Sequence, residues 1–466
     1  MLLVGWTVSR RSHSGEVFLM GGRKLGFGLL LGTIVATLVG TGSSMGAVAN
    51  GYTNGWGGAL YGLGGGVGII LLVQFFAEMR RHNFMTMPEE ISFYYGANKT
   101  VKAIVSIILY LASIGWLGAH ILGGSFYLSW ISGLDLPIAK IVTSIGFGLY
   151  VIVGGYLAVV WTDTIQSVIL FLGFVLMAIL AVPAAGGFDA INAAVPPENL
   201  SFLGIQKSGL IPAISLAVSI AAGVLAVPSY RQRIYTARDI SVVKKSFYIS
   251  AVAYFAFSIL PVIIGLSAYT INPALSNSNM AFPFMATSVF HPIMGALVLL
   301  SGLSATMSSG DSDALTSVTI LLRDVWVVIF GKVPDKTTVV PYSRWAIFLG
   351  IVLAFSFGIV AEDVLGYITK MISTLMSGIC VTAILGRFWK RATWQGAVGA
   401  LLSGSIISFM VMMNSSFSDF WGNPILPSLA GAAVIHVCVS LMTPKNTVTP
   451  ESALDIINKE RKDMDI

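Results

Sequence analysis

The sequence predicts an all-α protein that crosses a lipid bilayer many times. Of its 466 residues, 55% are hydrophobic and only 10% are charged, and the mean hydropathy is +0.83. Soluble globular domains carry about 25% charged residues. Apolar runs long enough to cross roughly 30 Å of hydrocarbon recur along the whole chain. We therefore expect a polytopic (multi-pass) membrane protein whose first partner is the lipid bilayer.

Twelve apolar runs are expected to span the membrane. They lie near residues 26–50, 55–79, 103–132, 136–160, 165–186, 209–228, 246–270, 290–322, 345–361, 364–386, 394–413 and 425–443. The first nine residues are apolar but too short to span, and they lack the charged start and cleavage site of a signal peptide. We expect residues 1–25 to hold the remnant of a further helix and a cytoplasmic segment, and residues 444–466 to form a cytoplasmic tail.

The basic residues predict the orientation of these spans. When the segment before the first span is placed in the cytoplasm, 24 of the 27 Lys and Arg residues fall on that side. Because positive loops stay in the cytoplasm, we expect a cytoplasmic C-terminus and a location in the inner (plasma) membrane. The same bias accounts for the net charge of +6, so no nucleic-acid partner is expected. The sequence sets no expectation for the oligomeric state.

The stretch ATMSSGDSDALTS, residues 305–317, is unusually polar for a span. Small and hydroxylated side chains fall on one stripe of the expected helix: Ala305, Ser308, Ser309, Ser312, Thr316 and Thr319. Asp311 and Asp313 flank the stripe, and an unpartnered carboxylate at membrane depth costs about 2.5–3.5 kcal/mol. Close helix packing explains serines alone. A carboxylate beside hydroxyls favours a hard-cation site, because such ions take several oxygen ligands.

A second acidic signal is Asp163, at the predicted junction of spans 4 and 5. Two interpretations stay open for this residue. Its carboxylate either caps the N-terminus of span 5 by accepting from free N–H groups, or it contributes to a cation site.

Glycine and proline interrupt two spans that occupy corresponding positions in the two halves of the chain. Span 1 contains Gly40, Gly42 and Gly46 beside two serines, and span 6 contains Gly223 and Pro228. Such breaks indicate discontinuous helices and a binding site near the middle of the membrane, since unwound carbonyls can ligate Na+. Small-residue packing is the alternative explanation for the glycines.

Other function classes lack support in the sequence. The five histidines are scattered and the two cysteines, Cys380 and Cys438, lie in apolar spans, so neither an enzyme site nor a zinc site is expected. A transporter-like membrane sensor would need a signalling domain, and the predicted cytoplasmic tail is short.

Four motifs together resemble the sodium:solute symporter family, which includes bacterial sodium/proline, sodium/galactose and sodium/sialic acid transporters. They are GGYLAVVWTDTIQS (154–167), YRQRIYTARD (230–239), ATMSSGDSDALTSVTILLRDVW (305–326) and GRFWKRATWQGAVGALLSG (386–404). The resemblance implies a LeuT-type inverted repeat of five plus five helices, residues 26–186 and 209–387, with discontinuous helices 1 and 6. Two additional helices would follow at 394–443. It also implies alternating access driven by inward Na+ flow.

The resemblance further implies two ion sites. The main Na+ site would use the carbonyls of Ala36, Val39 and Ala305 with the hydroxyls of Ser308 and Ser309. A second Na+ site, found in some members, would lie between Asp163 and residues one turn below, here Ser308, Asp311 and Ser312. Asp311 departs from the serine of the family. Its carboxylate could strengthen a cation site or bind a proton, and a proton-coupled symporter is therefore the alternative.

By the same resemblance, the solute would bind among spans 1, 2, 3, 6 and 10. The residues implied are Thr41, Gly42, Ser43, Gln74, Trp116 and His120. Trp116 and His120 are four residues apart and can act together on one helix face. No fixed charge lies in either broken helix, and span 6 has small side chains where sugar transporters place an aromatic gate. We therefore expect a small neutral, zwitterionic or monocarboxylate solute, with an amino acid favoured.

Overall fold

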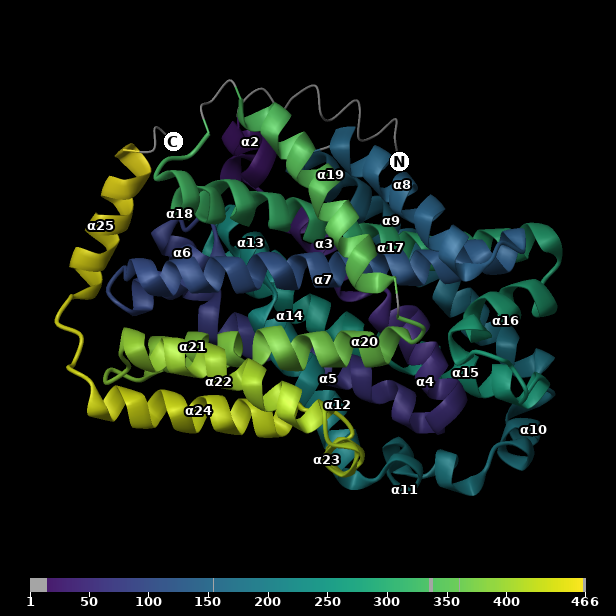
Figure 1. Cartoon of the computed structure of the whole chain (residues 1–466). Helices are drawn as coiled ribbons and strands as arrows, with labels where there is room; N and C mark the ends of the chain where they lie inside the picture. Colours follow the sequence, from purple (N-terminus) through teal and green to yellow (C-terminus); the bar gives the residue numbers. More distant parts are fainter. Residues whose placement is uncertain (1–14, 154, 335–337, 360, 464–466) are drawn as a thin grey trace.

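The computed structural model describes residues 15–463, apart from residues 154, 335–337 and 360. These residues form a bundle of helices, in which a single backbone bridge joins the extended residues Leu25 and Ala237 (Figure 1). The predicted all-α class is therefore confirmed. The helix remnant predicted for residues 1–9 lies outside the described residues.

The first half of the chain forms helices at the positions of predicted spans 1 to 5. They are α3 (Phe27–Leu38) with η2 (Gly42–Gly46) and α4 (Ala47–Asn54), α5 (Ala59–Phe76), α7 (Lys99–Ser132), α8 (Leu136–Val153) and α9 (Tyr156–Ala184). Short helices α2 (Gly15–Met20), α6 (Met87–Tyr94) and α10 (Gly187–Ala194) lie outside these runs.

The second half follows the same plan. Its helices are α12 (Leu210–Ala226) with α13 (Pro228–Thr236), α14 (Ile240–Phe257) with α15 (Ile259–Ile271), α17 (Pro292–Ile320), α19 (Val339–Gly358), and α20 (Val364–Met371) with α21 (Ser377–Phe388). Two further helices, α22 (Trp394–Met412) and α24 (Ile425–Met442), pack against each other. By length and apolar composition, eight of the described helices could cross a bilayer, or nine if α12 and α13 form one span.

The first predicted discontinuity lies between α3 and α4. α3 ends at Leu38, Val39 has non-helical backbone angles (φ −90°, ψ 64°), and the chain resumes as the wide turn η2. Ser43 Oγ donates to the carbonyl oxygen of Leu38 at 2.8 Å, which satisfies an acceptor at the helix end. Gly40 allows this segment to approach α17, because a Cβ here would lie 2.5 Å from Ser309 Oγ.

The second discontinuity lies between α12 and α13, whose axes are bent by 43°. Pro228 is the first residue of α13 and has no N–H to donate to α12. The residue before a proline is driven out of the helical region, and Val227 is accordingly extended (φ −70°, ψ 121°). Both predicted broken helices are therefore confirmed.

Two interpretations of local structure need correction. α9 begins at Tyr156, directly after Gly155 with its φ of +116°, and not near residue 165 as the sequence predicts. Asp163 consequently lies inside α9 and does not cap its N-terminus. Arg231 and Arg233 are among the 24 basic residues that the sequence places in cytoplasmic segments, but both are buried on α13, with exposures of 0% and 1%.

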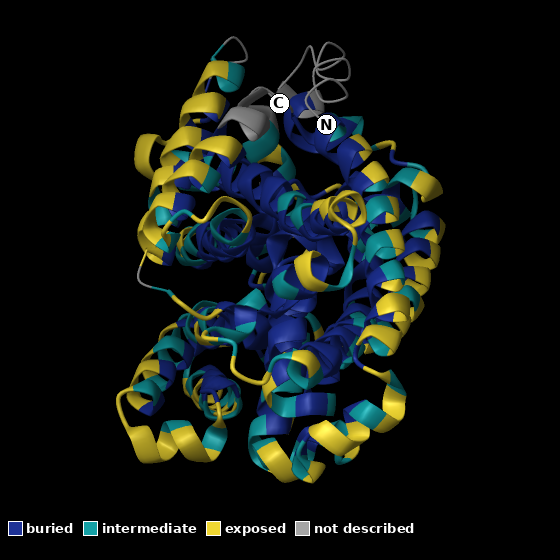
Figure 2. Ribbon diagram, turned by 90° about the vertical axis from the view of Figure 1, so that its right-hand side faces the viewer, coloured by how far each residue is buried: buried dark blue, intermediate teal, exposed yellow. Residues whose placement is uncertain are grey.

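The polar helix α17 lies inside the bundle. It packs against α3, α7, α8, α9 and α19, and residues 308–320 are all buried. Figure 2 shows buried residues in the interior and exposed residues on the outward faces of the surrounding helices. Large apolar side chains lie on these outward faces, for example Leu172 and Ile179 on α9. Such a distribution fits a protein surrounded by lipid.

The predicted tail contains the helix α25 (Pro450–Asp463), seen at the left edge of Figure 1, which docks against α6. Arg461 binds Glu89 on α6 with two hydrogen bonds of 2.8 Å. Lys102 at the start of α7 lies 3.4 Å from Glu460. The tail is thus held to the bundle by charged contacts.

Candidate functional site

The first oxygen cluster lies where α17 passes the end of α3. Ser308 Oγ donates to the carbonyl oxygen of Ala36 at 2.9 Å, and Ser309 Oγ donates to that of Thr37 at 3.1 Å. Ser308 Oγ also lies 3.3 Å from the carbonyl oxygen of Ala305 on its own helix. The last carbonyls of a helix have no partner within that helix, so the end of α3 presents acceptors to α17. The cluster therefore joins carbonyl and hydroxyl oxygens from two helices.

The donor set of this cluster suits Na+. All of its ligands are neutral hard oxygens, and each serine can turn its proton away and offer a lone pair to a cation. The structure brings together four of the five residues predicted for the main site: Ala36, Ala305, Ser308 and Ser309. Val39, the fifth, is the residue at which α3 stops. The break between α3 and α4 is what places these oxygens beside the paired serines.

A second cluster of oxygens, one turn along α17, surrounds the guanidinium of Arg233 from α13. Arg233 Nη2 donates to Ser312 Oγ at 2.7 Å and to Thr33 Oγ1 at 2.8 Å. The same nitrogen lies 3.3 Å from Asp163 Oδ2 and also contacts Thr37 Oγ1, so its two N–H groups are shared among four oxygen atoms. Thr33 in turn donates to Asp163. Four oxygen-bearing side chains thus converge on one positive group.

The sequence predicts a second Na+ site at this position, from Asp163, Asp311 and Ser312. The structure brings Asp163 and Ser312 together with a side-chain cation between them. Asp163 and Arg233 are 0% and 1% exposed, so the two charges compensate each other in the interior. Asp311 is also buried. It precedes Ser312 in the sequence and therefore lies about 100° around α17 from it. Arg233 was not predicted as part of this site, because it follows an apolar span and therefore resembles a charged residue of a loop.

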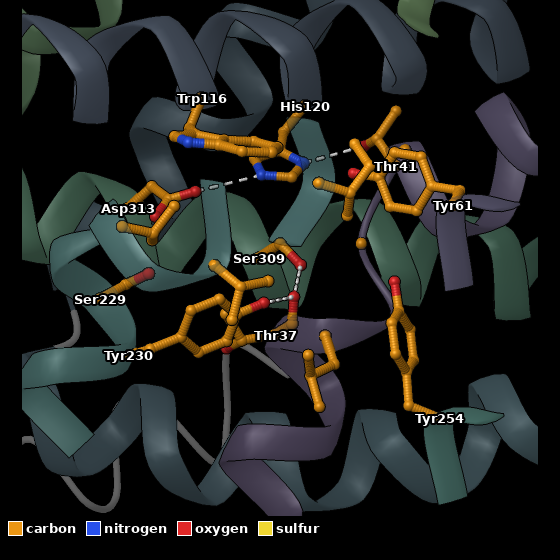
Figure 3. A pocket seen from close by; sticks show the side chains of 16 residues that line it. Thr37, Thr41, Tyr61, Trp116, His120, Ser229, Tyr230, Tyr254, Ser309 and Asp313 are labelled. Atoms are coloured by element: carbon orange, nitrogen blue, oxygen red, sulfur yellow. Dashed lines mark hydrogen bonds and ion pairs between the residues drawn. The ribbon is translucent and has the colours of Figure 1, made fainter. Parts of the chain in front are cut away.

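A cavity of about 40 Å³ lies next to the first cluster and is bounded by both broken helices (Figure 3). Its lining comes from α3 and the following turn, α5, α7, α12, α13, α14 and α17. The polar and aromatic residues are Thr37, Thr41, Tyr61, Trp116, His120, Ser229, Tyr230, Tyr254, Ser309 and Asp313. Because Ser309 belongs both to this lining and to the first cluster, the two sites share a wall.

A chain of hydrogen bonds crosses the cavity wall from the first broken helix to α17. Thr41 Oγ1 lies 2.9 Å from His120 Nδ1, and His120 Nε2 lies 3.2 Å from Asp313 Oδ2. Trp116 stacks on the His120 ring, with centroids 6.3 Å apart and planes inclined by 22°. Figure 3 shows this stack above the cavity, with Asp313 at one side. The predicted cooperation of Trp116 and His120 on one face of α7 matches this geometry.

The residues predicted to bind solute are divided by the structure. Four of them line the cavity: Thr41, Gly42, Trp116 and His120. Ser43 instead bonds to the backbone at the end of α3. Gln74 is exposed on α5 and is not among the lining residues.

The sequence reasoning missed the lining residues Tyr61, Ser229, Tyr230, Tyr254 and Asp313. Asp313 was noticed only as a flank of the serine stripe on α17. The signal in the sequence is its position one residue after Ser312, which places it about 100° around α17 from that serine. In the structure this side of α17 faces α7, where Asp313 contacts His120.

A larger cavity of about 400 Å³ lies among α4, α12 and α20. Its polar lining includes Asn50 and Asn54 from α4, together with Asp363 and Asn423. This cavity is wide enough for a small organic molecule, whereas the smaller one has room for only about three waters.

A buried network of charged and aromatic side chains surrounds Glu90 on α6. Arg231 Nη1 donates to Glu90 Oε1 at 2.7 Å, and both side chains are 0% exposed. Tyr94 donates to the same carboxylate at 2.6 Å, and Tyr235 also donates to it. The Arg231 guanidinium lies 3.2 Å from the centre of the Phe76 ring. These contacts fasten α13 to α5 and α6.

The broken helices, the oxygen cluster and the adjacent cavity are together typical of a membrane transporter. A model of the sodium:solute symporter family matches residues 18–404, and the chain therefore belongs to this family.

Relatives and solved structures agree with this assignment. The chain is 22% identical to the high-affinity proline transporter PutP of Bacillus subtilis, over 97% of this chain and 98% of that protein. It is 23% identical to a sodium/pantothenate symporter of Haemophilus influenzae, over 76% and 74% of the two chains. A Na+-coupled sialic acid symporter, solved in a substrate-bound outward-open state, has a similar fold with a TM-score of 0.79, 18% identity and 96% coverage of both chains.

The protein is a secondary active transporter that couples Na+ flow to the uptake of a small organic solute, and it is not an enzyme. Its fold is the LeuT-type inverted repeat. The expectations from the sequence about class, coupling ion and fold are thereby confirmed.

Proposed function

We propose that Na+ binds at the first cluster, through the carbonyls of Ala36, Val39 and Ala305 and the hydroxyls of Ser308 and Ser309. The observation that carries this proposal is the convergence of the end of α3 on the paired serines of α17. An ion at this position links the first broken helix to α17. Because Ser309 also lines the cavity, binding of the ion and shaping of the solute site are coupled.

One Na+ then moves in each cycle. The position of the second cluster is filled by the guanidinium of Arg233, which makes the contacts that a second ion would make. Placing Na+ next to that guanidinium would bring two positive charges within a few ångströms, which is unfavourable in a low-dielectric interior. Asp163 and Ser312 are accordingly hydrogen-bond partners of a fixed side-chain cation.

The solute binds in the cavity between the broken helices, next to the Na+ cluster, and this cavity of about 40 Å³ must widen when the solute enters. Thr41, Gly42, Trp116 and His120 form one wall of it. Proline and pantothenate are the solutes named for the relatives. The larger cavity among α4, α12 and α20 is the entrance, and the Arg231–Glu90 network is the closed exit. If the C-terminus lies on the cytoplasmic side of the inner membrane, a carrier with this open entrance and closed exit faces outward.

A thermal-shift experiment on the purified protein tests the ion site. A ligand that binds only the folded form at 100 times its Kd stabilises it by about 2.7 kcal/mol. The wild type should therefore melt higher in NaCl than in KCl of equal ionic strength, and Ser309→Ala should lose this difference while still inserting into the membrane.

Ser317→Ala is the matched control, because Ser317 is buried on the same helix and bonds only to the carbonyl of Ala314 within the described residues. Its NaCl response should equal that of the wild type. An undiminished response of Ser309→Ala would refute the site assignment. The same assay, run with amino acids, monocarboxylates, sugars, urea and amines, would identify the solute by its Na+-dependent stabilisation.

A further inference from the structure

The charge of the small cavity comes from one carboxylate. Among the described lining residues there is no Lys or Arg, and Asp313 is the only acidic side chain. Asp313 is 4% exposed, and its carboxylate Oδ2 lies 3.2 Å from His120 Nε2. A buried carboxylate facing a ligand cavity is costly unless the ligand supplies donors or positive charge.

The hydrogen bonds of His120 are satisfied by the neutral form of its ring. If Nε2–H donates to Asp313, the bare Nδ1 accepts from the hydroxyl of Thr41. In this arrangement the His120 ring adds no positive charge to the cavity. The described lining then holds an acidic side chain without a basic one, in contrast to the second cluster, where Arg233 lies beside Asp163.

Aromatic faces surround the same space. Trp116, Tyr61, Tyr230 and Tyr254 all line the cavity, and Figure 3 shows Tyr230 on the side of Asp313 and Tyr61 and Tyr254 opposite. Aromatic rings attract cations through their negative faces. The hydroxyl of Ser229 is also part of the lining, is fully buried, and has no hydrogen-bond partner among the described residues. This hydroxyl oxygen is a further acceptor that a ligand in the cavity could use.

We propose that the transported solute carries an ammonium group, which binds between the carboxylate of Asp313 and the aromatic rings of the cavity. This inference rests on the proposed function of the cavity and names its substrate class. An ammonium offers three donors, which match Asp313, the free hydroxyl of Ser229 and the π faces. A solute with a carboxylate and no amine would meet a buried negative charge without a compensating side chain. Monocarboxylates are therefore disfavoured, and amines and amino acids are favoured.

Three-carbon probes that differ only in charge test this assignment on the purified full chain. They are propylammonium, β-alanine, propionate and propionamide, titrated up to roughly 0.1 M because fragments of this size bind weakly. Melting temperature in NaCl at constant ionic strength is the readout. Propylammonium, β-alanine or both should raise it, and propionate and propionamide should not. Stabilisation by propionate or propionamide equal to that by the amines, or none by either amine, would overturn the proposal.

Variants of two buried carboxylates show whether the preference depends on Asp313. Asp313→Asn should raise the half-saturating concentration of the amines by roughly 30-fold or more, as expected for loss of one partner of a buried charge pair. Asp313→Glu keeps the charge and should keep the preference for amines over the amide. Asp324→Asn removes another buried carboxylate, near Lys102 at the far end of α17, and should respond like the wild type.

The response to NaCl without any probe is measured in the same preparations. A Na+ shift that persists while the amine preference is absent would refute the substrate class alone. Loss of the Na+ shift in the wild type would refute the proposed ion site instead. An unchanged amine response in folded Asp313→Asn, shown to be folded by its Na+ shift, would refute the role of this carboxylate.

Discussion

Replacing Arg233 with glutamine should convert the second oxygen cluster into a Na+ site. The substitution removes the group that contacts Thr33, Thr37, Asp163 and Ser312, and it leaves the buried Asp163 without its counter-charge. Removing one partner of a buried ion pair costs about 3–5 kcal/mol. A cation from solution can offset part of that cost, because the remaining oxygens keep their positions on α3, α9 and α17.

The electrical consequence of a second ion is large. Each additional positive charge carried inward adds about 2.3 kcal/mol per 100 mV of membrane potential. At 1.36 kcal/mol per decade, this corresponds to roughly 50-fold steeper accumulation of solute. Arg233→Gln should therefore melt lower than the wild type in KCl, recover in NaCl, and show a Na+ dependence whose Hill coefficient rises from about one to about two.

The assay is a Na+ titration of melting temperature, followed by reversal-potential measurements in proteoliposomes. Arg233→Lys keeps a cation in the cluster and should keep one-ion behaviour. The double variant Arg233→Gln/Asp163→Asn removes both charges and should neither gain a second ion nor lose as much stability as Arg233→Gln alone. A wild type that binds two Na+ with Arg233 in place, or an Arg233→Gln protein that stays first order in Na+, would refute the reasoning.

Two other changes test the ends of the molecule and the helix break. Gly40→Ala places a Cβ 2.5 Å from Ser309 Oγ and should weaken Na+ binding at least tenfold in the melting assay. Gly28→Ala, in the first turn of the preceding helix α3, meets nothing within 4 Å and should not weaken it. Equal Na+ affinities of the two variants would contradict the close approach. At the tail, two effects act on the pKa of Glu89. Burial raises it, but the contacts with Arg461 lower it by a larger amount, so the folded pKa lies below its ordinary value. The docking energy is then complete above the unfolded pKa of about 4.3 and is lost as pH falls through the lower folded value. Protease cleavage within the tail helix should be slow from about pH 8 to 5 and faster below about pH 4, and Glu89→Gln should make it fast throughout; cleavage that ignores pH would argue against the contact.

The features that the sequence predicted well are local ones. Pro228 has no N–H, and it drives the residue before it out of the helix in any context. The glycines and serines of the first break, and the double serine of α17, likewise carry their signal in a few adjacent residues. The residues of the first oxygen cluster, in contrast, were predicted only through the family resemblance that these motifs carry.

The features that the sequence missed depend on which way a helix faces. α5 is apolar on all sides, so periodicity did not reveal that Gln74 points outward. Arg231 and Arg233 resemble loop charges because they follow an apolar run, and only the packing of α13 under α17 and α6 shows that they are buried. Asp163 resembles an N-cap in the sequence, but α9 begins at Tyr156, directly after Gly155, and Asp163 therefore lies inside this helix.

The carboxylate of Glu90 holds three side chains at once, two of them from α13 and one from its own helix α6. A carrier of this kind must release its cargo to the inside without opening a continuous pore, since a pore would dissipate the ion gradient that drives it. α13 can separate from α6 at this point only when the bonds of Arg231 and Tyr235 to the one carboxylate have both broken, so a single bond that opens transiently leaves the two helices joined.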